Sequence, residues 1–337
     1  MAQRVTMSDV AREAGVSLMT VSRVVNEKGE ISPETRQRVQ EVIARLGYRP
    51  SGIARSLAGG QTHTIGLVVP DIANPYFSGI AHGVASVANA EGFGVLLCDC
   101  EEETTREISM LDVLEEKRVD GVIVAAPRTP TADLLPVLER HPNAVIVNRL
   151  FDETEYTSAS GYVINDDKAG GYAIAKHLIE RGHKHIAFLA GPPTSYGSMR
   201  RMRGYQLALE ENYLDFNPEI VRYCTPTVEG GRVIIGQLLA EHPEISGLFC
   251  FNDLVAIGVL QQLQQLGLKV PDDLAIIGYD DIPMASWVTP SLSTCRVNFE
   301  EMGREATKLL INYISDCTED CKNIVMQPRL IIRESAP

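Results

Sequence analysis

The sequence predicts two kinds of structure in one chain: an all-α helix-turn-helix headpiece and, after it, an α/β core of two similar parallel-sheet subdomains. Residues 1–50 contain short amphipathic segments, each bounded by helix-capping residue types. From residue 64 onward, continuous apolar runs alternate with amphipathic windows, which is typical of parallel strands covered by helices on both faces. The first 60 residues carry a net charge of +3 and the remainder −16, so a small basic unit sits on an acidic body, an arrangement compatible with nucleic-acid binding by the basic part.

Three helices are expected in the headpiece. Thr6 begins a capping box before a short helix that Gly15 ends. Ser17 caps the second helix, and Pro33 takes the first position of the third helix, which Gly47 closes. Two short helices joined by a tight glycine-containing turn are the helix-turn-helix pattern.

The second helix has more apolar residues than packing requires. Val21 and Val24 recur at helical spacing and predict a face directed to a core. Leu18 and Met19 lie off that stripe in the first turn, and Arg23 follows. The pattern therefore predicts two apolar side chains and an arginine on the surface of a short helix.

Residues 51–61 form a hinge or linker with one brief helical patch, "IARSLA". This patch is much shorter than the roughly 12–15 residues that an isolated helix needs to persist in water. We expect it to become helical only with support from another surface.

The core extends over residues 62–337 and contains at least nine predicted strands. These are residues 64–70, 94–99, 121–126, 144–148, 185–191, 220–224, 247–252, 274–281 and 293–298. So many strands favour two sheets, and we assign about 62–163 plus 293–322 to an N-subdomain and about 164–292 plus 323–337 to a C-subdomain. Because open parallel sheets bind ligands at the carboxyl ends of their strands, two facing halves predict a small-molecule cleft between them.

Composition and motifs argue against other classes of protein. No apolar run approaches the roughly 20 residues of a membrane span, and the N-terminus lacks a signal-peptide pattern, so we expect a cytoplasmic protein without a membrane partner. The seven scattered cysteines favour reduced thiols, and we expect neither a metal site nor a cofactor. The first core strand is followed by "PDIANPYF", without the glycine cluster of a dinucleotide site. A phosphate-binding loop, a nucleophile elbow and a zinc-protease pair are also missing, so we expect no catalytic residues and no enzyme.

Several segments taken together carry a family resemblance. They are "DVAREAGVSLMTVSRVVN", "YRPSGIARSLAGG", "IGLVVPDIANPYFSGI", "RMRGYQLAL", "FNDLVAIG", "VPDDLAIIGYDD" and "PSLSTCRVN". In this order they closely resemble the LacI/GalR family of bacterial transcriptional regulators over essentially residues 5–335. The resemblance implies a hinge helix, a periplasmic-binding-protein-like core that binds a small-molecule effector, and a homodimer acting on double-stranded, palindromic operator DNA.

The resemblance also implies which headpiece residues contact DNA. Base contacts fall on Leu18, Met19 and Arg23, and backbone contacts on Thr6, Ser17, Thr20 and Ser22. Arginine is the commonest bidentate reader of guanine, and apolar side chains can meet thymine methyl groups. The alternative for Leu18 and Met19 is packing on the first helix, and for the four hydroxyl residues it is helix capping or solvation.

In the hinge, Ala54, Arg55 and Leu57 match the family's minor-groove residues. An apolar wedge at Leu57 would kink the duplex. Alternatively, Leu57 packs on its own core.

Seven residues of the core match the family's effector cleft: Asp71, Tyr76, Phe77, Asn148, Arg201, Asn252 and Asp280. A guanidinium with a carboxylate and an amide suits adjacent sugar hydroxyls, which donate and accept hydrogen bonds. The alternatives are helix capping for Asn252, core packing for the two aromatic residues and a surface ion pair for Arg201.

Pro226 stands where relatives often carry an aromatic residue, which removes one stacking surface. From the resemblance and the polar residues of the cleft, we expect a repressor of carbohydrate-utilisation genes whose effector is a sugar or sugar derivative. The alternative is a solute-binding module with a non-functional headpiece. The sequence leaves open whether the effector releases DNA or promotes its binding.

Overall fold

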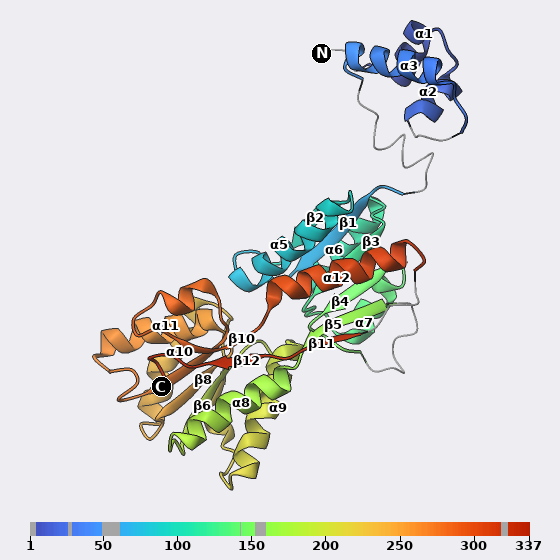
Figure 1. Cartoon of the computed structure of the whole chain (residues 1–337). Coiled ribbons are helices and arrows are strands. Elements are labelled where there is room, and N and C mark those ends of the chain that lie inside the picture. Colours follow the sequence, from blue (N-terminus) through green and yellow to red (C-terminus); the bar gives the residue numbers. More distant parts are fainter. Residues whose placement is uncertain (1–4, 26–28, 49–60, 142, 152–159, 318–322) are drawn as a thin grey trace. The chain divides into compact units, whose positions relative to one another are not determined.

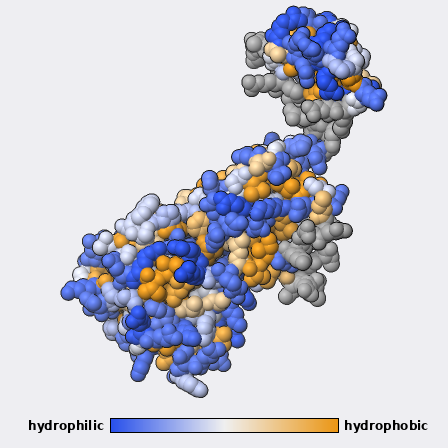
Figure 2. All heavy atoms as spheres, viewed as in Figure 1, coloured by the Kyte–Doolittle hydropathy of each residue, from blue (hydrophilic) through white to orange (hydrophobic). Residues whose placement is uncertain are grey.

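The computed structural model describes residues 5–25, 29–48, 61–141, 143–151, 160–317 and 323–337. The chain divides into two compact units, Met1–His63 and Thr64–Pro337. Figure 1 shows the helices and strands of both units. On the face shown in Figure 2, hydrophilic residues predominate and apolar residues are gathered in patches.

The described part of the headpiece, residues 5–25 and 29–48, forms three helices around one small apolar core. They are α1 (Met7–Ala14), α2 (Leu18–Val25) and α3 (Pro33–Leu46). The buried side chains come from all three helices, and Val10, Val21 and Val39 are completely buried. Gly15 and Gly47 adopt left-handed backbone conformations at the C-termini of α1 and α3, where glycine has no steric cost.

In the second unit, the described residues form two six-stranded sheets with helices on their faces. The first sheet has the order β11-β5-β4-β3-β1-β2 and the second β12-β10-β9-β8-β6-β7. All described strand pairs are parallel except the pair of β10 with β12. The predicted fold class, a helical headpiece with two parallel-sheet subdomains, is confirmed.

The strands of the first sheet are β1 (Thr64–Val69), β2 (Gly94–Asp99), β3 (Gly121–Ala125), β4 (Ala144–Val147), β5 (Ser160–Asn165) and β11 (Ile324–Met326). Its helices are α5 (Pro75–Ala90), α6 (Thr104–Glu116), α7 (Thr131–Leu138) and α12 (Phe299–Ile314). The strands of the second sheet are β6 (Ile186–Ala190), β7 (Val221–Tyr223), β8 (Gly247–Cys250), β9 (Ala275–Asp280), β10 (Ser293–Arg296) and β12 (Arg329–Ile331). Its helices are α8 (Asp167–Glu180), α9 (Tyr196–Glu211), α10 (Val228–Glu241) and α11 (Asp253–Leu266), with short 3-10 helices at Pro218–Ile220 and Pro283–Ser286.

The predicted subdomain boundaries are wrong at the C-terminal crossings. Residues 293–296 were assigned to the N-subdomain, but β10 pairs with β9 in the second sheet, so the chain crosses over only after this strand. Residues 324–326 were assigned to the C-subdomain, but β11 pairs with β5 in the first sheet. β5, β11 and β12 were not predicted as strands. β11 and β12 are sheet edges of three residues each, and so short a strand leaves little periodicity to detect.

Within the described ranges, no helix combines the length and the hydropathy that crossing a bilayer requires.

Candidate functional site

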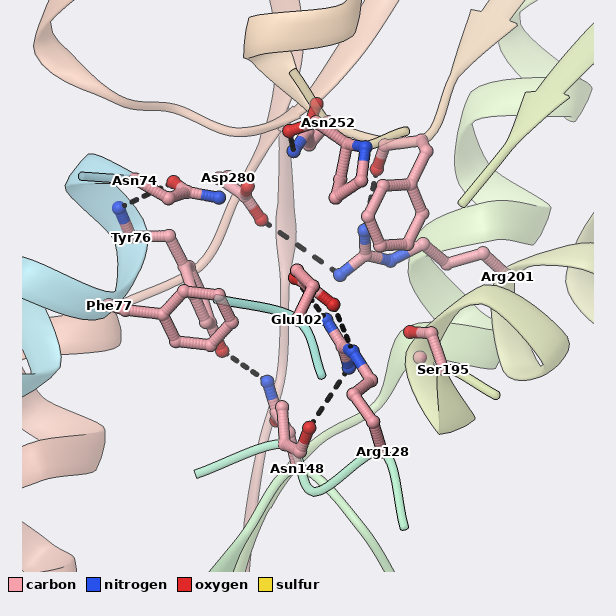
Figure 3. A pocket seen from close by; sticks show the side chains of 14 residues that line it. Asn74, Tyr76, Phe77, Glu102, Arg128, Asn148, Ser195, Arg201, Asn252 and Asp280 are labelled. Carbon is pink, nitrogen blue, oxygen red and sulfur yellow. Dashed lines mark hydrogen bonds and ion pairs between the residues drawn. The ribbon is translucent and has the colours of Figure 1, made fainter. Parts of the chain in front are cut away.

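A polar pocket lies where the carboxyl ends of the strands of both sheets meet (Figure 3). Its empty space is about 410 Å³ with open solvent at the mouth included, which is near the lower end of the range for small-molecule sites. The pocket is therefore narrow. Its lining residues are Asn74, Tyr76, Phe77, Glu102, Ala126, Arg128, Asn148, Ser195, Gly197, Arg201, Pro226, Phe251, Asn252 and Asp280.

Arg201 on α9 is the centre of the C-subdomain wall. The side chain is buried, its Nε donates to Asp167 Oδ1 at 2.9 Å, and its Nη1 donates to the Phe251 carbonyl at 2.6 Å. Its guanidinium lies 3.6 Å from the centroid of the Tyr279 ring. Burial lowers the pKa of Arg201, but Asp167, Tyr279 and Asp280 raise it more, so the group stays charged. The arginine is thus a fixed buried cation and not a surface ion pair.

Asp280 is the last residue of β9 and lies opposite Arg201. Its Oδ1 is 3.9 Å from Arg201 Nη2, an ion-pair distance longer than a hydrogen bond. Its backbone φ is +105°, an unusual value for a residue with a side chain. Burial raises the pKa of Asp280, while the positive charge of Arg201 lowers it less. A ligand hydroxyl between these two groups could accept from the guanidinium and donate to the carboxylate.

Asn252 uses both ends of its amide within the protein. Its Oδ1 accepts from the Val255 backbone at 2.9 Å, which caps α11, and its Nδ2 donates to the Pro226 carbonyl at 3.2 Å. The capping alternative for Asn252 is therefore observed, although the residue also lines the pocket. This hydrogen bond holds the loop that carries Pro226, which stands at the position where relatives often have an aromatic residue.

Tyr76 and Phe77 form the aromatic part of the N-subdomain wall. Their rings meet edge to face with centroids 5.0 Å apart. The Tyr76 hydroxyl accepts a hydrogen bond from Asn148 Nδ2. Asn148 follows β4 with a φ of +58°, and its Oδ1 accepts from the Asn165 backbone at 3.2 Å. The two rings belong to the core cluster and also line the pocket. Core packing and pocket lining are therefore both observed for them.

Asp71 is the one predicted cleft residue that does not line the pocket. Its Oδ1 accepts from the Ala73 backbone at 2.8 Å within the turn between β1 and α5. In this turn Asn74, and not Asp71, reaches the pocket and caps α5 through a 3.0 Å hydrogen bond from the Tyr76 backbone. The placement of Asp71 in the cleft is corrected because the carboxylate is used to build the turn.

Arg128 and Glu102 are pocket residues that the sequence reasoning missed. Arg128 Nε and Nη2 donate to the two Glu102 carboxylate oxygens at 2.7 and 3.1 Å, and the pair meets in the middle of Figure 3. A usable signal existed, because Glu102 and Arg128 stand within a few residues after the ends of predicted strands. The other missed residues lie at the last positions of predicted strands or in the turns and helix starts that follow them. Those are Asn74, Ala126, Ser195, Gly197 and Phe251.

On the headpiece, the first turn of α2 presents its apolar side chains outward. Leu18 is 51% and Met19 65% exposed, whereas Val21 in the next turn is completely buried. Arg23 is exposed as well. The alternative that Leu18 and Met19 merely pack on α1 is therefore wrong.

The hydroxyl residues of the headpiece act as caps. Thr6 Oγ1 accepts from the Asp9 backbone at 3.3 Å, and Asp9 returns a bond to the Thr6 backbone at 3.0 Å. Ser17 Oγ accepts from the Thr20 backbone at 3.1 Å and also meets Thr20 Oγ1 at 2.9 Å. Ser22 is half-buried. Capping thus accounts for Thr6 and Ser17, and both side chains remain exposed.

Ala54, Arg55 and Leu57 lie outside the described residues. In the described part of the chain, no group of three or more His, Cys, Asp or Glu side chains could hold a metal ion.

A helix-turn-helix unit and a two-subdomain core with a polar pocket, carried by one chain, define the class of DNA-binding transcriptional regulators with a ligand-binding core. Residues 6–51 match the family model of bacterial regulatory proteins, lacI family, and residues 175–336 match the periplasmic binding protein-like domain. Among curated relatives, the HTH-type transcriptional repressor PurR of Aliivibrio fischeri (strain ATCC 700601 / ES114) is 34% identical over 332 residues, 98% of each chain. The chain belongs to the LacI family of bacterial regulatory proteins.

Solved structures give the same result. A complex of the transcriptional regulator CelR with cellobiose is 31% identical with a TM-score of 0.74, over 98% of this chain and 100% of that one. The lac repressor dimer bound to operator and the anti-inducer ONPF is 28% identical with a TM-score of 0.86, over 99% of each chain. These relatives are regulators or repressors of transcription.

Proposed function

We propose that this protein is a homodimeric, cytoplasmic repressor that binds a palindromic operator and changes its affinity for DNA when a sugar or sugar derivative occupies the core pocket. The observation that carries the proposal is the outward placement of Leu18, Met19 and Arg23 on one helix, in a unit whose other described large apolar side chains are buried or half-buried. Exposed apolar and cationic groups of this kind suit the major groove. The lac repressor dimer on its operator supports the same mode of assembly.

The chemistry of the pocket favours a polyhydroxylated effector. Arg201 and Asp280 offer a donor and an acceptor from the C-subdomain wall, and Tyr76 and Phe77 offer an apolar surface opposite. Pro226 removes an aromatic ring that could have stacked on a flat heterocycle. The cellobiose complex of CelR is a relative with a sugar ligand and supports this choice.

Control of DNA binding follows from linkage. An effector can shift the equilibrium between two conformations of the core only by its differential affinity for them. Because the pocket has walls from both subdomains, a ligand that contacts both favours their closed arrangement. This change would reach the headpiece through the hinge, where Leu57 serves as the minor-groove wedge, and Leu57→Ala would then reduce DNA bending and affinity together.

The test is selection of DNA from a random pool by the full chain, followed by binding assays on the selected site. Arg23→Ala should abolish the preference for one base pair per half-site and leave weak, salt-sensitive binding. Arg38→Ala is the matched control, because it removes the same charge from an exposed position of α3. If both variants keep full base selectivity, Arg23 has no role in base recognition.

The rival function, a solute-binding module with an inactive headpiece, gives the opposite result. In that case the full chain would select no twofold-symmetric site, with or without candidate sugars, although sugars would still bind to the core.

A further inference from the structure

The loop after β3 carries Arg128, a pocket residue, and two charged side chains hold the backbone of this loop. The buried Glu107 carboxylate accepts the backbone N–H of Arg128 at 2.8 Å and that of Thr129 at 3.2 Å. Arg149 Nη1 donates to the carbonyls of Pro127 at 3.2 Å and Thr129 at 2.6 Å. Two charged side chains therefore fix the backbone that presents Arg128, so this guanidinium is preorganised.

The guanidinium of Arg128 is almost completely buried, with 5% exposure. Its Nη1 donates to the Ala126 carbonyl at 3.0 Å. Its Nε and Nη2 form a two-pronged contact with the Glu102 carboxylate, the geometry with which arginine binds any carboxylate. Arg128 thus presents a carboxylate-binding fork inside the effector pocket.

Glu102 is held differently from Arg128. It lies in the short connection between β2 and α6, where Glu101 and Glu102 have φ values of +50° and +60°. Its backbone N–H donates to the Pro70 carbonyl at 2.7 Å, and its side chain is 23% exposed. Within the described residues, the hydrogen bonds of its carboxylate go to Arg128 alone. The carboxylate can therefore move into water without breaking another hydrogen bond in this part of the chain.

The charges of the lining balance when Glu102 is in place. Arg128 and Arg201 supply two positive charges, and Glu102 and Asp280 two negative charges. If Glu102 turns outward, the buried fork of Arg128 loses its carboxylate partner, whereas Arg201 keeps its ion pair with Asp167. A ligand carboxylate would restore both the charge balance and the two hydrogen bonds.

We propose that the effector is a sugar acid, a polyhydroxylated molecule with one carboxylate, which displaces Glu102 from Arg128. This inference rests on the proposed effector function of the pocket and names the class of ligand. The hydroxyls would bind between Arg201 and Asp280, and the carboxylate would take the place of the Glu102 carboxylate. A planar carboxylate reproduces the Glu102 contact in a narrow pocket, whereas a phosphate is bulkier and carries more charge.

The experiment compares neutral sugars with their acids by calorimetry on the full chain. The probes are D-glucose with D-glucuronate and D-gluconate, D-galactose with D-galacturonate, and D-glucose 6-phosphate. We expect at least one acid to bind about tenfold or more tightly than its neutral parent. Arg128→Gln should remove this preference, and Arg128→Lys should restore only part of it because lysine lacks the fork.

Glu102→Gln gives the second readout. It keeps the size of the side chain and removes the competing charge, so we expect the affinity for the acid to rise about tenfold. Arg140→Gln is the matched control, because Arg140 pairs with Asp112 and Glu115 on the surface and should not affect the preference. Thermal unfolding of each variant shows whether it is folded before binding is compared.

Each other outcome overturns the inference. Neutral parents that bind as tightly as the acids, a panel in which no acid binds, or a Glu102→Gln variant that binds the acid more weakly would each exclude displacement of Glu102. Tighter binding of the phosphate than of every carboxylate would exclude a sugar acid. Operator binding is measured in parallel: a neutral sugar that binds and alters DNA affinity leaves the proposed function intact, whereas an acid that binds without altering it contradicts the proposed function alone.

Discussion

The headpiece and the core pocket reverse the usual distribution of side chains in opposite ways. On α2, Leu18 and Met19 are more than half exposed in a unit that has few apolar residues to bury. In the pocket, Arg201 and Asp280 are buried with 5% and 4% exposure in a core that has many apolar residues available. Apolar residues at the surface and charges in the interior are the informative exceptions in a globular protein.

The exposed apolar residues of α2 and the buried charges of the pocket have different consequences for the stability of the protein. The exposed apolar residues need no partner in the free protein, so their removal should affect DNA and leave the fold intact. The buried charges need each other, since an unpaired charge in the interior costs several kcal/mol. Function and stability are therefore separable on α2 and coupled in the pocket.

The largest expected effect is on the core. Arg201→Ala should lower the free energy of unfolding by about 3–5 kcal/mol, because it leaves the buried carboxylates of Asp167 and Asp280 without their cation. Urea denaturation checks this, with Arg203→Ala, an exposed arginine of the same helix, as control. If Arg201→Ala lowers the free energy of unfolding by less than about 1 kcal/mol, the buried charges of the pocket do not stabilise the fold as expected.

A second effect comes from Asp253, whose carboxylate accepts from Thr294 Oγ1 at 2.6 Å and from the Ile282 backbone at 2.9 Å. Burial raises the pKa of Asp253 to about 7 from its usual value of 3.8. A raised carboxyl pKa means that the folded state binds its proton more tightly than the unfolded state. The stabilisation is therefore complete below pH 3.8 and is lost as the pH rises to about 7.

The loss should be of the order of 3–4 kcal/mol for this single group. Asp253→Asn removes the titrating proton and keeps the size of the side chain. Unfolding free energies measured between pH 5 and 8 should therefore fall more steeply for the natural protein than for the variant. Parallel pH profiles of the two proteins would show that Asp253 remains ionised throughout.

A smaller effect is expected from the cap of α1. Thr6→Ala should lower the stability of the headpiece by about 1 kcal/mol, since it removes the capping hydrogen bond to Asp9. Ser8→Ala, at an exposed position of the same helix, is the control and should change little. Thermal unfolding without DNA measures the capping role separately from any phosphate contact.

The smallest effect on stability is predicted for the exposed pair on α2. Leu18→Ala and Met19→Ala should each change the unfolding free energy by no more than about 0.5 kcal/mol. Val21→Ala should destabilise the headpiece clearly, because Val21 is completely buried. Both exposed variants should nevertheless alter operator selectivity in a binding assay. Loss of stability without loss of selectivity would contradict the assignment of this surface to DNA.

Much of the fold could be predicted because it depends on neighbours in sequence. Thr6 with Asp9, Gly15, and Ser17 with Thr20 form caps within a few residues of each other, and the structure contains each of these contacts. The nine predicted strands likewise form strands, since continuous apolar runs suit sheets buried on both faces. Six of the seven predicted cleft residues line the pocket, because they lie at the carboxyl ends of strands or in the loops and helices that begin there.

Local sequence sets the helix boundaries of the headpiece and the alternation of strands and helices in the core, since hydrogen bonds and periodicity over a few residues decide these features. Only the tertiary structure decided that Ser293–Arg296 joins the second sheet, that Asp71 stays outside the pocket, and that Glu102 meets Arg128. These three outcomes depend on contacts between segments far apart in the chain. Their energies come from pairing, burial and charge in three dimensions, which no local pattern encodes.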